Sequence, residues 1–182
     1  MTSQLSSINQ IIGSGIELLS SVGLNGCSVE AIASRSGCAK GLVNYHFGSK
    51  DALLLRVAER LRDERHQARV AAMDRPGSAA LDALWRVTAA DVRSGWSRAW
   101  LALLSNPPTA ESIQPTGLQI QSLTRVVGEA LEIPVDRLDP ALLQAGLEGI
   151  EVRLLCGAEP ILIREAYDRF WLGILNEDSS GR

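Results

Sequence analysis

The segment at residues 28–50 constrains the fold more than any other part of this 182-residue chain. It reads as two short helices: Ile32 lies on the apolar face of the first, and Val43 and Phe47, four residues apart, face inward on the second. Between them stands Gly37, which can adopt the positive φ that a sharp turn between helices requires. The segment therefore predicts a helix-turn-helix.

The second of these helices keeps a mixed polar face after its apolar positions are assigned. That face consists of Lys40, Gly41, Leu42, Asn44, Tyr45 and His46. Hydrogen-bond donors, a methyl-bearing side chain and an aromatic ring suit the major groove of DNA, where base edges present donors, acceptors and the thymine methyl. We therefore expect this helix to read DNA.

Five short motifs in this region stand at the spacing of a known family. They are Ala-Ile-Ala at 31–33, Gly37, Lys40-Gly41, Tyr45-His46-Phe47, and Ser49-Lys50 followed by Asp-Ala-Leu at 51–53. The region resembles the recognition helix and following helix of the TetR family of transcriptional repressors, over about residues 8–55 in motif and over the whole chain in architecture. The resemblance implies an all-α fold of about nine helices. It places a three-helix, helix-turn-helix DNA-binding domain at residues 1–48 and a helical effector-binding and dimerisation domain at 49–182.

The resemblance also implies roles for individual residues. Lys40 is expected to donate to guanine or to a phosphate, Asn44 to pair with adenine, and Leu42 to contact a thymine methyl. The other matching positions are expected to contact phosphates: Tyr45, His46, Lys50 and Ser28, which also caps its helix. Two positions depart from the family pattern, because Ala39 stands where a capping Ser or Thr is usual and Asn44 where an aromatic is frequent.

The charge of the predicted reading domain is small for a DNA-binding protein. The chain has a formal net charge of −3, and residues 1–50 hold three basic side chains, Arg35, Lys40 and Lys50, against Glu17 and Glu30. No basic arm precedes the first helix. Because each phosphate neutralised by a cation releases counterions, few cations predict a shallow dependence of DNA affinity on salt.

The rest of the chain is predicted to be helical throughout, with no strand pattern. A Ser7-x-x-Gln10 capping box predicts that the first helix begins at Ser7, and Gly23 is expected to end it. Glycines 13 and 15 within it are reasonable only if another helix approaches closely. Apolar spacing and Pro or Gly breaks predict the others at about 50–73, 78–93, 96–105, 117–131, 140–156 and 160–175.

The last two predicted helices carry apolar stripes suited to a dimer interface. The residues expected there are Leu143, Gly146, Leu147, Ile150, Leu154, Tyr167, Phe170, Trp171 and Ile174. Two such helices per subunit can form a four-helix bundle across a two-fold axis, and a palindromic operator would match that symmetry. The alternative is that both helices pack on the core of their own subunit, and the family resemblance favours the dimer.

The family resemblance further implies a small-molecule effector held among the helices of the second domain. Trp85, Trp96 and Trp100 lie in that part of the chain and are candidates to line an apolar pocket for an uncharged or aromatic compound. The alternative is that these rings are core packing residues. A DNA-binding dimer with no small-molecule effector is the second interpretation of the function.

Other classes of function are disfavoured by the sequence. An enzyme is a remote alternative, because no catalytic motif, nucleophile elbow or phosphate loop occurs, and we expect no cofactor and no metal site. The three cysteines have no metal-ligand spacing and are expected to be reduced packing residues. Glu148 and Glu151 are expected on a solvated ionic face. With neither a signal peptide nor an apolar run long enough for a membrane span, the protein is expected in the cytoplasm, away from membranes.

Overall fold

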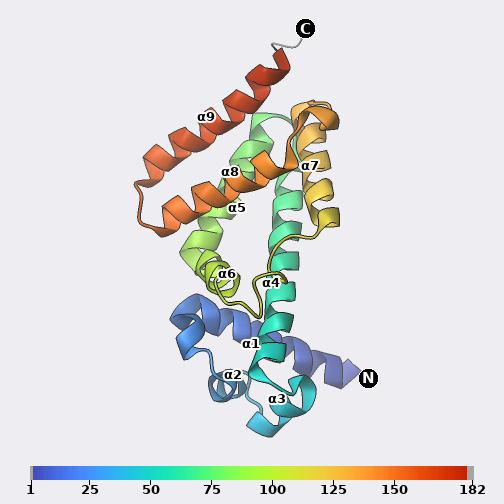
Figure 1. The fold of residues 1–182 in the computed structure, drawn as a ribbon, viewed down its shortest axis with the longest axis vertical. Coiled ribbons are helices and arrows are strands. Elements are labelled where there is room, and N and C mark those ends of the chain that lie inside the picture. The colour runs from blue at the N-terminus through green and yellow to red at the C-terminus, as the bar shows by residue number, and fades with distance from the viewer. Residues whose placement is uncertain (1, 180–182) are drawn as a thin grey trace. The chain divides into compact units, whose positions relative to one another are not determined.

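The computed structural model describes residues 2–179 of the chain (Figure 1). Within those residues it has nine α-helices and one short 3-10 helix, η1, and no strand. The elements are α1 (Thr2–Gly26), α2 (Val29–Arg35), α3 (Lys40–Phe47), α4 (Lys50–Ala72), α5 (Ser78–Ser94), α6 (Trp96–Leu104), α7 (Gly117–Leu131), η1 (Val135–Arg137), α8 (Pro140–Leu155) and α9 (Pro160–Ser179). The all-α prediction is confirmed, and most predicted bounds agree within one or two residues.

The start of the first helix is the clearest difference from the predicted elements. The helix already runs from Thr2, so Ser7 lies inside it and the predicted capping box does not form its beginning. Gly23 does interrupt the helix as predicted, because its φ of 71° and ψ of −173° lie outside the helical region. The capping-box pattern was misleading because Ser and Gln are also tolerated within a helix, where no cap is needed.

The chain forms two compact units. Within the described residues, the first comprises residues 2–64 and 94–114, and the second comprises residues 65–93 and 115–179. The helix-turn-helix therefore shares its unit with the first part of α4 and with α6. The second unit contains the end of α4 together with α5, α7, α8 and α9.

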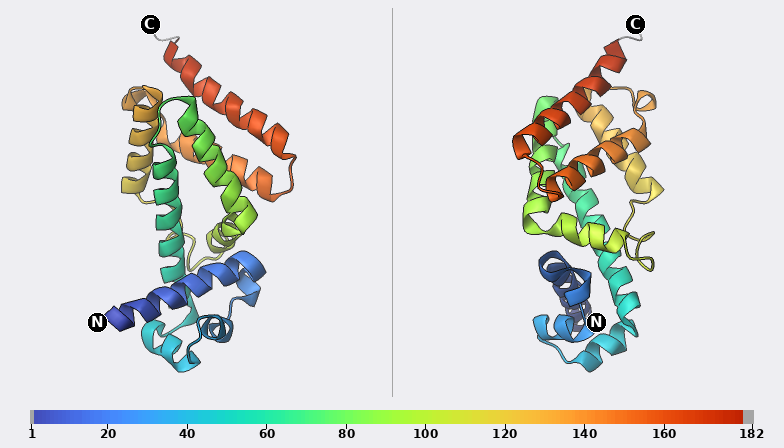
Figure 2. Two further views of the ribbon diagram at one scale, coloured as in Figure 1. Left: turned by 180° about the vertical axis from the view of Figure 1, so that it is seen from behind. Right: turned by 60° about the vertical axis from the view of Figure 1, so that its left-hand side comes forward.

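Two glycines allow close helix contacts in the first unit. A Cβ at Gly15 of α1 would lie 2.7 Å from Cγ2 of Val57 on α4, which confirms the predicted close approach at this glycine. Gly13 has no such neighbour. A Cβ at Gly95, just before α6, would lie 2.5 Å from the backbone oxygen of Ser20. Figure 2 shows α1 crossing α4 and passing α6 in two further views.

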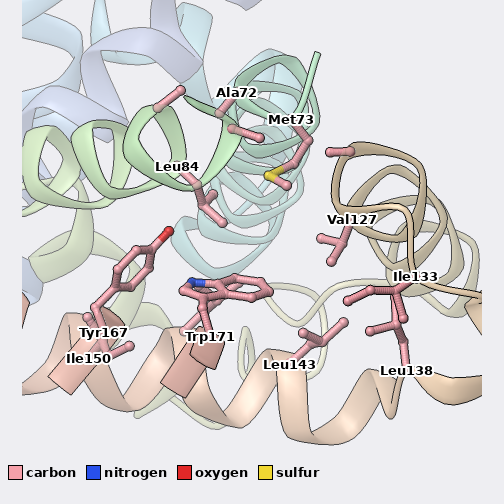
Figure 3. Close-up of a cluster of buried hydrophobic side chains, with 14 of the residues drawn as sticks. Ala72, Met73, Leu84, Val127, Ile133, Leu138, Leu143, Ile150, Tyr167 and Trp171 are labelled. Carbon is pink, nitrogen blue, oxygen red and sulfur yellow. The ribbon is translucent and has the colours of Figure 1, made fainter. Parts of the chain in front are cut away.

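The core of the second unit is built from five helices. Ala72 at the end of α4, Leu84 of α5 and Val127 of α7 pack with side chains from α8 and α9. Figure 3 shows Trp171 of α9 among these residues, with the ring of Tyr167 beside it at a centroid separation of 6.0 Å. The Tyr167 hydroxyl donates a hydrogen bond of 2.7 Å to the backbone oxygen of Leu81 on α5, so α9 is fixed to α5 by both packing and a polar contact.

An ionic cluster is buried inside the same unit. Glu151 of α8 is fully buried, and its Oε2 accepts hydrogen bonds of 2.6 Å from Arg65 and 2.9 Å from Arg69, both on α4. The predicted solvated position of Glu151 is therefore wrong, whereas Glu148 is half-buried and accepts a bond from Gln144. Helical spacing alone does not reveal a buried carboxylate, because its two arginine partners lie more than eighty residues away in sequence.

Residues 2–179 contain no helix that combines the length and apolar content of a membrane span.

Candidate nucleic-acid interface

The turn between α2 and α3 is held by backbone and side-chain hydrogen bonds. Ser28 caps α2, because its side chain accepts from the backbone N–H of Ala31 at 3.1 Å. At the other end, Gly37 has a φ of 66°, as the sequence predicts, and the N–H of Cys38 donates to the carbonyl of Ala33 at 3.0 Å. Such bonds satisfy backbone groups that a helix end leaves unpaired, so the turn has a defined geometry.

A further contact attaches this turn to α1. The side-chain amide of Gln10 donates to the backbone oxygen of Ser36 at 3.1 Å, and the Ser36 hydroxyl donates to the carbonyl of Ile32 at 2.8 Å. Ile32 is itself fully buried. The turn is therefore anchored to α1 and to the core of its unit.

The orientation of α3 follows from two inward residues. Val43 is 1% exposed and Phe47 is half-buried, as their spacing predicts. Ala39 occupies the N-cap position and makes no side-chain capping hydrogen bond, so this departure from the family pattern has its expected structural effect. Gly48, with a φ of 75°, ends α3, and Ser49 then caps α4 by accepting from the N–H of Ala52.

The predicted reading residues share the outer side of α3. The exposed ones are Lys40, Gly41, Leu42, Asn44 and Tyr45. Tyr45 is 76% exposed, and its ring meets that of His46 edge to face at 5.2 Å. His46 is half-buried between Tyr45 and Phe47, which leaves it less available than its neighbours. Lys50 is exposed at the start of α4, whereas Ser28 is half-buried and already engaged as a cap.

Acidic residues pair with two of the cations in this region. Lys40 forms an ion pair with Glu30 of α2, and Arg35 forms one of 3.1 Å with Glu17 of α1. The hydrogen bond from Lys40 has the largest effect on the pKa of the Glu30 carboxyl and lowers it. A backbone hydrogen bond lowers it further. Nothing in the sequence near Glu30 identifies Lys40 as its partner, because the two residues are ten positions apart and meet only through the α2–α3 turn.

The three tryptophans proposed to line an effector pocket have different surroundings. Trp100 is buried in the first unit, and Trp96 borders a hollow of about 260 Å³ between α1 and α4 in that unit. Trp85 belongs to the second unit, where its ring lies 5.3 Å from that of Tyr167 and the Arg164 guanidinium lies over it at 5.5 Å.

The second unit also has an open groove of about 680 Å³ between α4 and α7. Its lining combines apolar side chains with polar and charged ones: Val70, Met73, Val126 and Ala130 stand beside His66, Gln67, Asp74, Arg75 and Glu129. None of the three tryptophans lines this groove.

The residues proposed for a dimer interface are mostly covered by their own subunit. The buried ones are Leu143, Leu147, Ile150, Tyr167 and Trp171. Leu154, Phe170 and Ile174 are half-buried and pack against the same core. A Cβ at Gly146 would collide with the ring of Phe170, so this glycine allows α8 and α9 of one chain to approach. These residues therefore pack on the core of their own subunit, which is the alternative that the sequence left open.

Both helices nevertheless leave apolar side chains exposed on another side. These are Leu142 on α8 and Ile161, Leu162 and Leu172 on α9, with exposed fractions between 46% and 69%. Ile161 and Leu172 are eleven residues apart, which is about three helical turns, so they lie on one side of α9. Gly149 of α8 is exposed, and a Cβ there would meet no atom within 4 Å.

Comparison with known proteins agrees with this geometry. Residues 11–57 match the family model described as "Bacterial regulatory proteins, tetR family". No curated protein matches the chain in sequence. Among solved structures, a transcriptional regulator from Rhodococcus sp. Rha1 is 24% identical, with a TM-score of 0.71 over 93% of this chain and 96% of that chain.

Two further solved structures show the same fold. The TetR family transcriptional regulator PfmR from Thermus thermophilus is 17% identical, with a TM-score of 0.60 over 88% of this chain and 92% of that one. The multidrug binding protein EbrR, in complex with ethidium, is 20% identical, with a TM-score of 0.64 over 90% and 98% of the two chains.

Proposed function

We propose that this chain, whose residues 11–57 match the model of the TetR family of bacterial regulatory proteins, is a homodimeric repressor that binds a palindromic operator and is released by a small effector. The family consists of transcriptional regulators and not of enzymes. The observation that carries the proposal is the exposed outer side of α3, held by a capped α2 and an anchored turn. A cytoplasmic location is part of the same proposal, since the operator is there.

Base reading is assigned to the residues that α3 leaves uncovered. Lys40 can donate to guanine, Asn44 can pair with adenine, and Leu42 can contact a thymine methyl, because all three are exposed. Tyr45 and Lys50 are also exposed and are assigned to phosphates. His46 and Ser28 are half-buried, so their contribution to binding is expected to be smaller.

The dimer is assigned to the exposed apolar side of α8 and α9, around Leu142, Gly149, Ile161 and Leu172. Large exposed aliphatic side chains gathered on two neighbouring helices are typical of an interface. The core residues named from the sequence act indirectly, by fixing the position of both helices. A dimer of this kind would present two α3 helices to successive major grooves, about 34 to 36 Å apart.

The effector is assigned to the helical second unit, and an apolar or aromatic compound is favoured. A solved structure with the same fold, EbrR, holds ethidium. In this chain the α4–α7 groove has a mixed lining, in which apolar side chains stand beside polar and charged ones, and a volume within the range of small-molecule sites. Of the three tryptophans, Trp85 lies in this unit and remains a candidate for contact, whereas Trp96 and Trp100 lie in the first unit and can serve as fluorescent reporters. The effector must bind the DNA-free arrangement more tightly, because equal affinity for both states shifts neither.

The DNA-binding proposal is tested by selecting duplexes from a random pool with the purified protein and measuring affinity for the selected sequence. Lys40→Ala and Tyr45→Ala should abolish the electrophoretic shift while the dimer mass is unchanged. Arg125→Ala, which removes an exposed, ion-paired cation of α7, is the matched control and should bind normally. Unchanged binding by both α3 variants would refute the assignment.

The effector proposal is tested by thermal-shift and tryptophan-fluorescence screens with uncharged and aromatic compounds. A compound that raises the melting temperature and weakens the operator shift would support it. A regulator without an effector would respond to the operator duplex alone, which is the second candidate function.

A further inference from the structure

The first observation is that the cation at the start of the recognition helix has an acidic partner. Lys40 is the first residue of α3, and its ammonium group is ion-paired with the carboxylate of Glu30 in the first turn of α2. Both side chains are more than half exposed. Because exposed ion pairs contribute little to stability, this one does little to hold α2 and α3 together.

The second observation is that the carboxylate lies on the same solvent-facing surface as the reading residues of α3. Glu30 is itself exposed, and it touches the ammonium group that begins the exposed side of that helix. A DNA phosphate that approached Lys40 would therefore also approach Glu30. The carboxylate repels a phosphate while it attracts Lys40.

We propose that Glu30 is a specificity-determining residue of the DNA interface, and that it restrains Lys40 from phosphates while leaving it able to donate to a base edge. This inference rests on the proposed function. An ammonium group has three N–H donors, so Lys40 can keep one on Glu30 and give another to a neutral acceptor such as guanine O6 or N7. A phosphate in the same position would stand beside the carboxylate, and the like charges would oppose it.

Glu30 would therefore affect the affinity for arbitrary DNA and the affinity for the operator to different extents. Binding to arbitrary DNA depends on cation–phosphate contacts, whereas discrimination depends on base edges. Glu30 weakens the first and spares the second, so it raises the ratio of operator affinity to random-duplex affinity. Arg35 is similarly paired with Glu17, which leaves the reading unit, as we call residues 1–50, with few cations for phosphates.

The test compares Glu30→Gln with the natural protein on a selected duplex and on a random-sequence duplex, each over a series of salt concentrations. Glu30→Gln should bind the random duplex roughly tenfold more tightly at low salt, because each subunit gains one phosphate contact. Each contact should steepen the slope of log affinity against log salt by about 0.9, which is about 1.8 for the dimer. Affinity for the selected duplex should rise less, so the specificity ratio should fall.

Two further variants separate this role from a general charge effect. Glu129→Gln removes the acidic partner of an exposed ion pair on α7, with the same change in net charge, and should leave the slope and the ratio unchanged. In a Lys40→Met background, Glu30→Gln should no longer steepen the slope on the random duplex, because the restrained cation is gone. Circular dichroism should show the same helix content in every variant.

The inference is overturned if Glu30→Gln keeps the natural slope and specificity ratio, or if its effect persists without Lys40. Failure of the proposed function would look different, since the natural protein would then select no duplex and bind no random one.

Discussion

Ionic contacts in two regions of this protein have the same chemistry and opposite surroundings. In the reading unit, Lys40–Glu30 and Arg35–Glu17 are exposed, with each side chain between 45% and 65% accessible. In the second unit, Arg65, Arg69 and Glu151 form an ionic cluster that is nearly or fully buried. Water weakens the first kind, so its members can exchange partners at little cost. The second kind has no solvent to replace a lost partner, so it fixes α4 to α8.

The comparison is tested most strongly by Glu151→Ala. Removing this carboxylate leaves Arg65 and Arg69 buried side by side, and burial already lowers the pKa of Arg65 to about 10. We expect a loss of about 3 to 5 kcal/mol in the free energy of unfolding, measured by urea denaturation. A loss below about 1 kcal/mol would mean that the cluster behaves like the exposed pairs.

The second test concerns Asp91, which lies 4.0 Å from Arg65 at the edge of the same cluster. Burial raises the pKa of Asp91 to about 6, and the repulsion of Glu151 adds to this effect against the attraction of Arg65 and Arg69. A carboxyl with a raised pKa binds its proton more tightly in the folded protein. Its contribution to stability is therefore complete below about pH 4 and is lost as the pH rises through about 6.

Asp91→Asn should accordingly stabilise the protein by up to about 3 kcal/mol above about pH 7, since the amide carries no charge to desolvate. Below about pH 4 the variant and the natural protein should have similar stability. Urea denaturation across this pH range measures both values. A variant that is less stable at every pH would show that the ionised carboxylate is a net favourable partner of Arg65.

A third test compares a neutral contact of the reading unit with its exposed ion pairs. Ser28→Ala removes the cap of α2 and should cost about 1 kcal/mol in the free energy of unfolding. Ser28→Gly should cost less, because glycine is a tolerated N-cap. If thermal and urea denaturation of the alanine variant match the natural protein, the helix end is satisfied in some other way.

The smallest effect is expected for Glu17→Gln. Its partner Arg35 is exposed, so the free energy of unfolding should change by less than about 0.5 kcal/mol. The variant should nevertheless bind a random duplex somewhat more tightly, because Arg35 becomes available to phosphates. A large change in stability with no change in DNA binding would contradict the claim that the exposed ion pairs contribute less to stability than the buried cluster.

The sequence predicted the parts of the structure that depend on local spacing. The Gly37 turn, the inward positions of Val43 and Phe47, and the exposed side of α3 all follow from helical periodicity over a few residues. The absence of a side-chain cap at Ala39 could also be predicted from the sequence, because a cap depends on the identity of a single residue.

What the sequence did not predict depends on contacts between distant residues. An apolar stripe on α8 or α9 looks the same whether it faces its own core or a partner, so Leu147 and Trp171 were assigned to a dimer interface although they are buried in one chain. The burial of Glu151 was missed for the same reason, since nothing near it in sequence identifies Arg65 as its partner.

The first unit is built from two separate stretches of the chain. Residues 94–114 belong to it, although residues 65–93, which precede them, belong to the second unit. Gly95, at the beginning of the second stretch, has no room for a side chain against Ser20. A hybrid regulator made by joining residues 1–48 to a foreign effector domain would therefore lack residues 49–64 and 94–114, which pack with the helix-turn-helix in the same unit. We expect an active hybrid to need both segments of the first unit, with Gly95 retained at the start of the second segment.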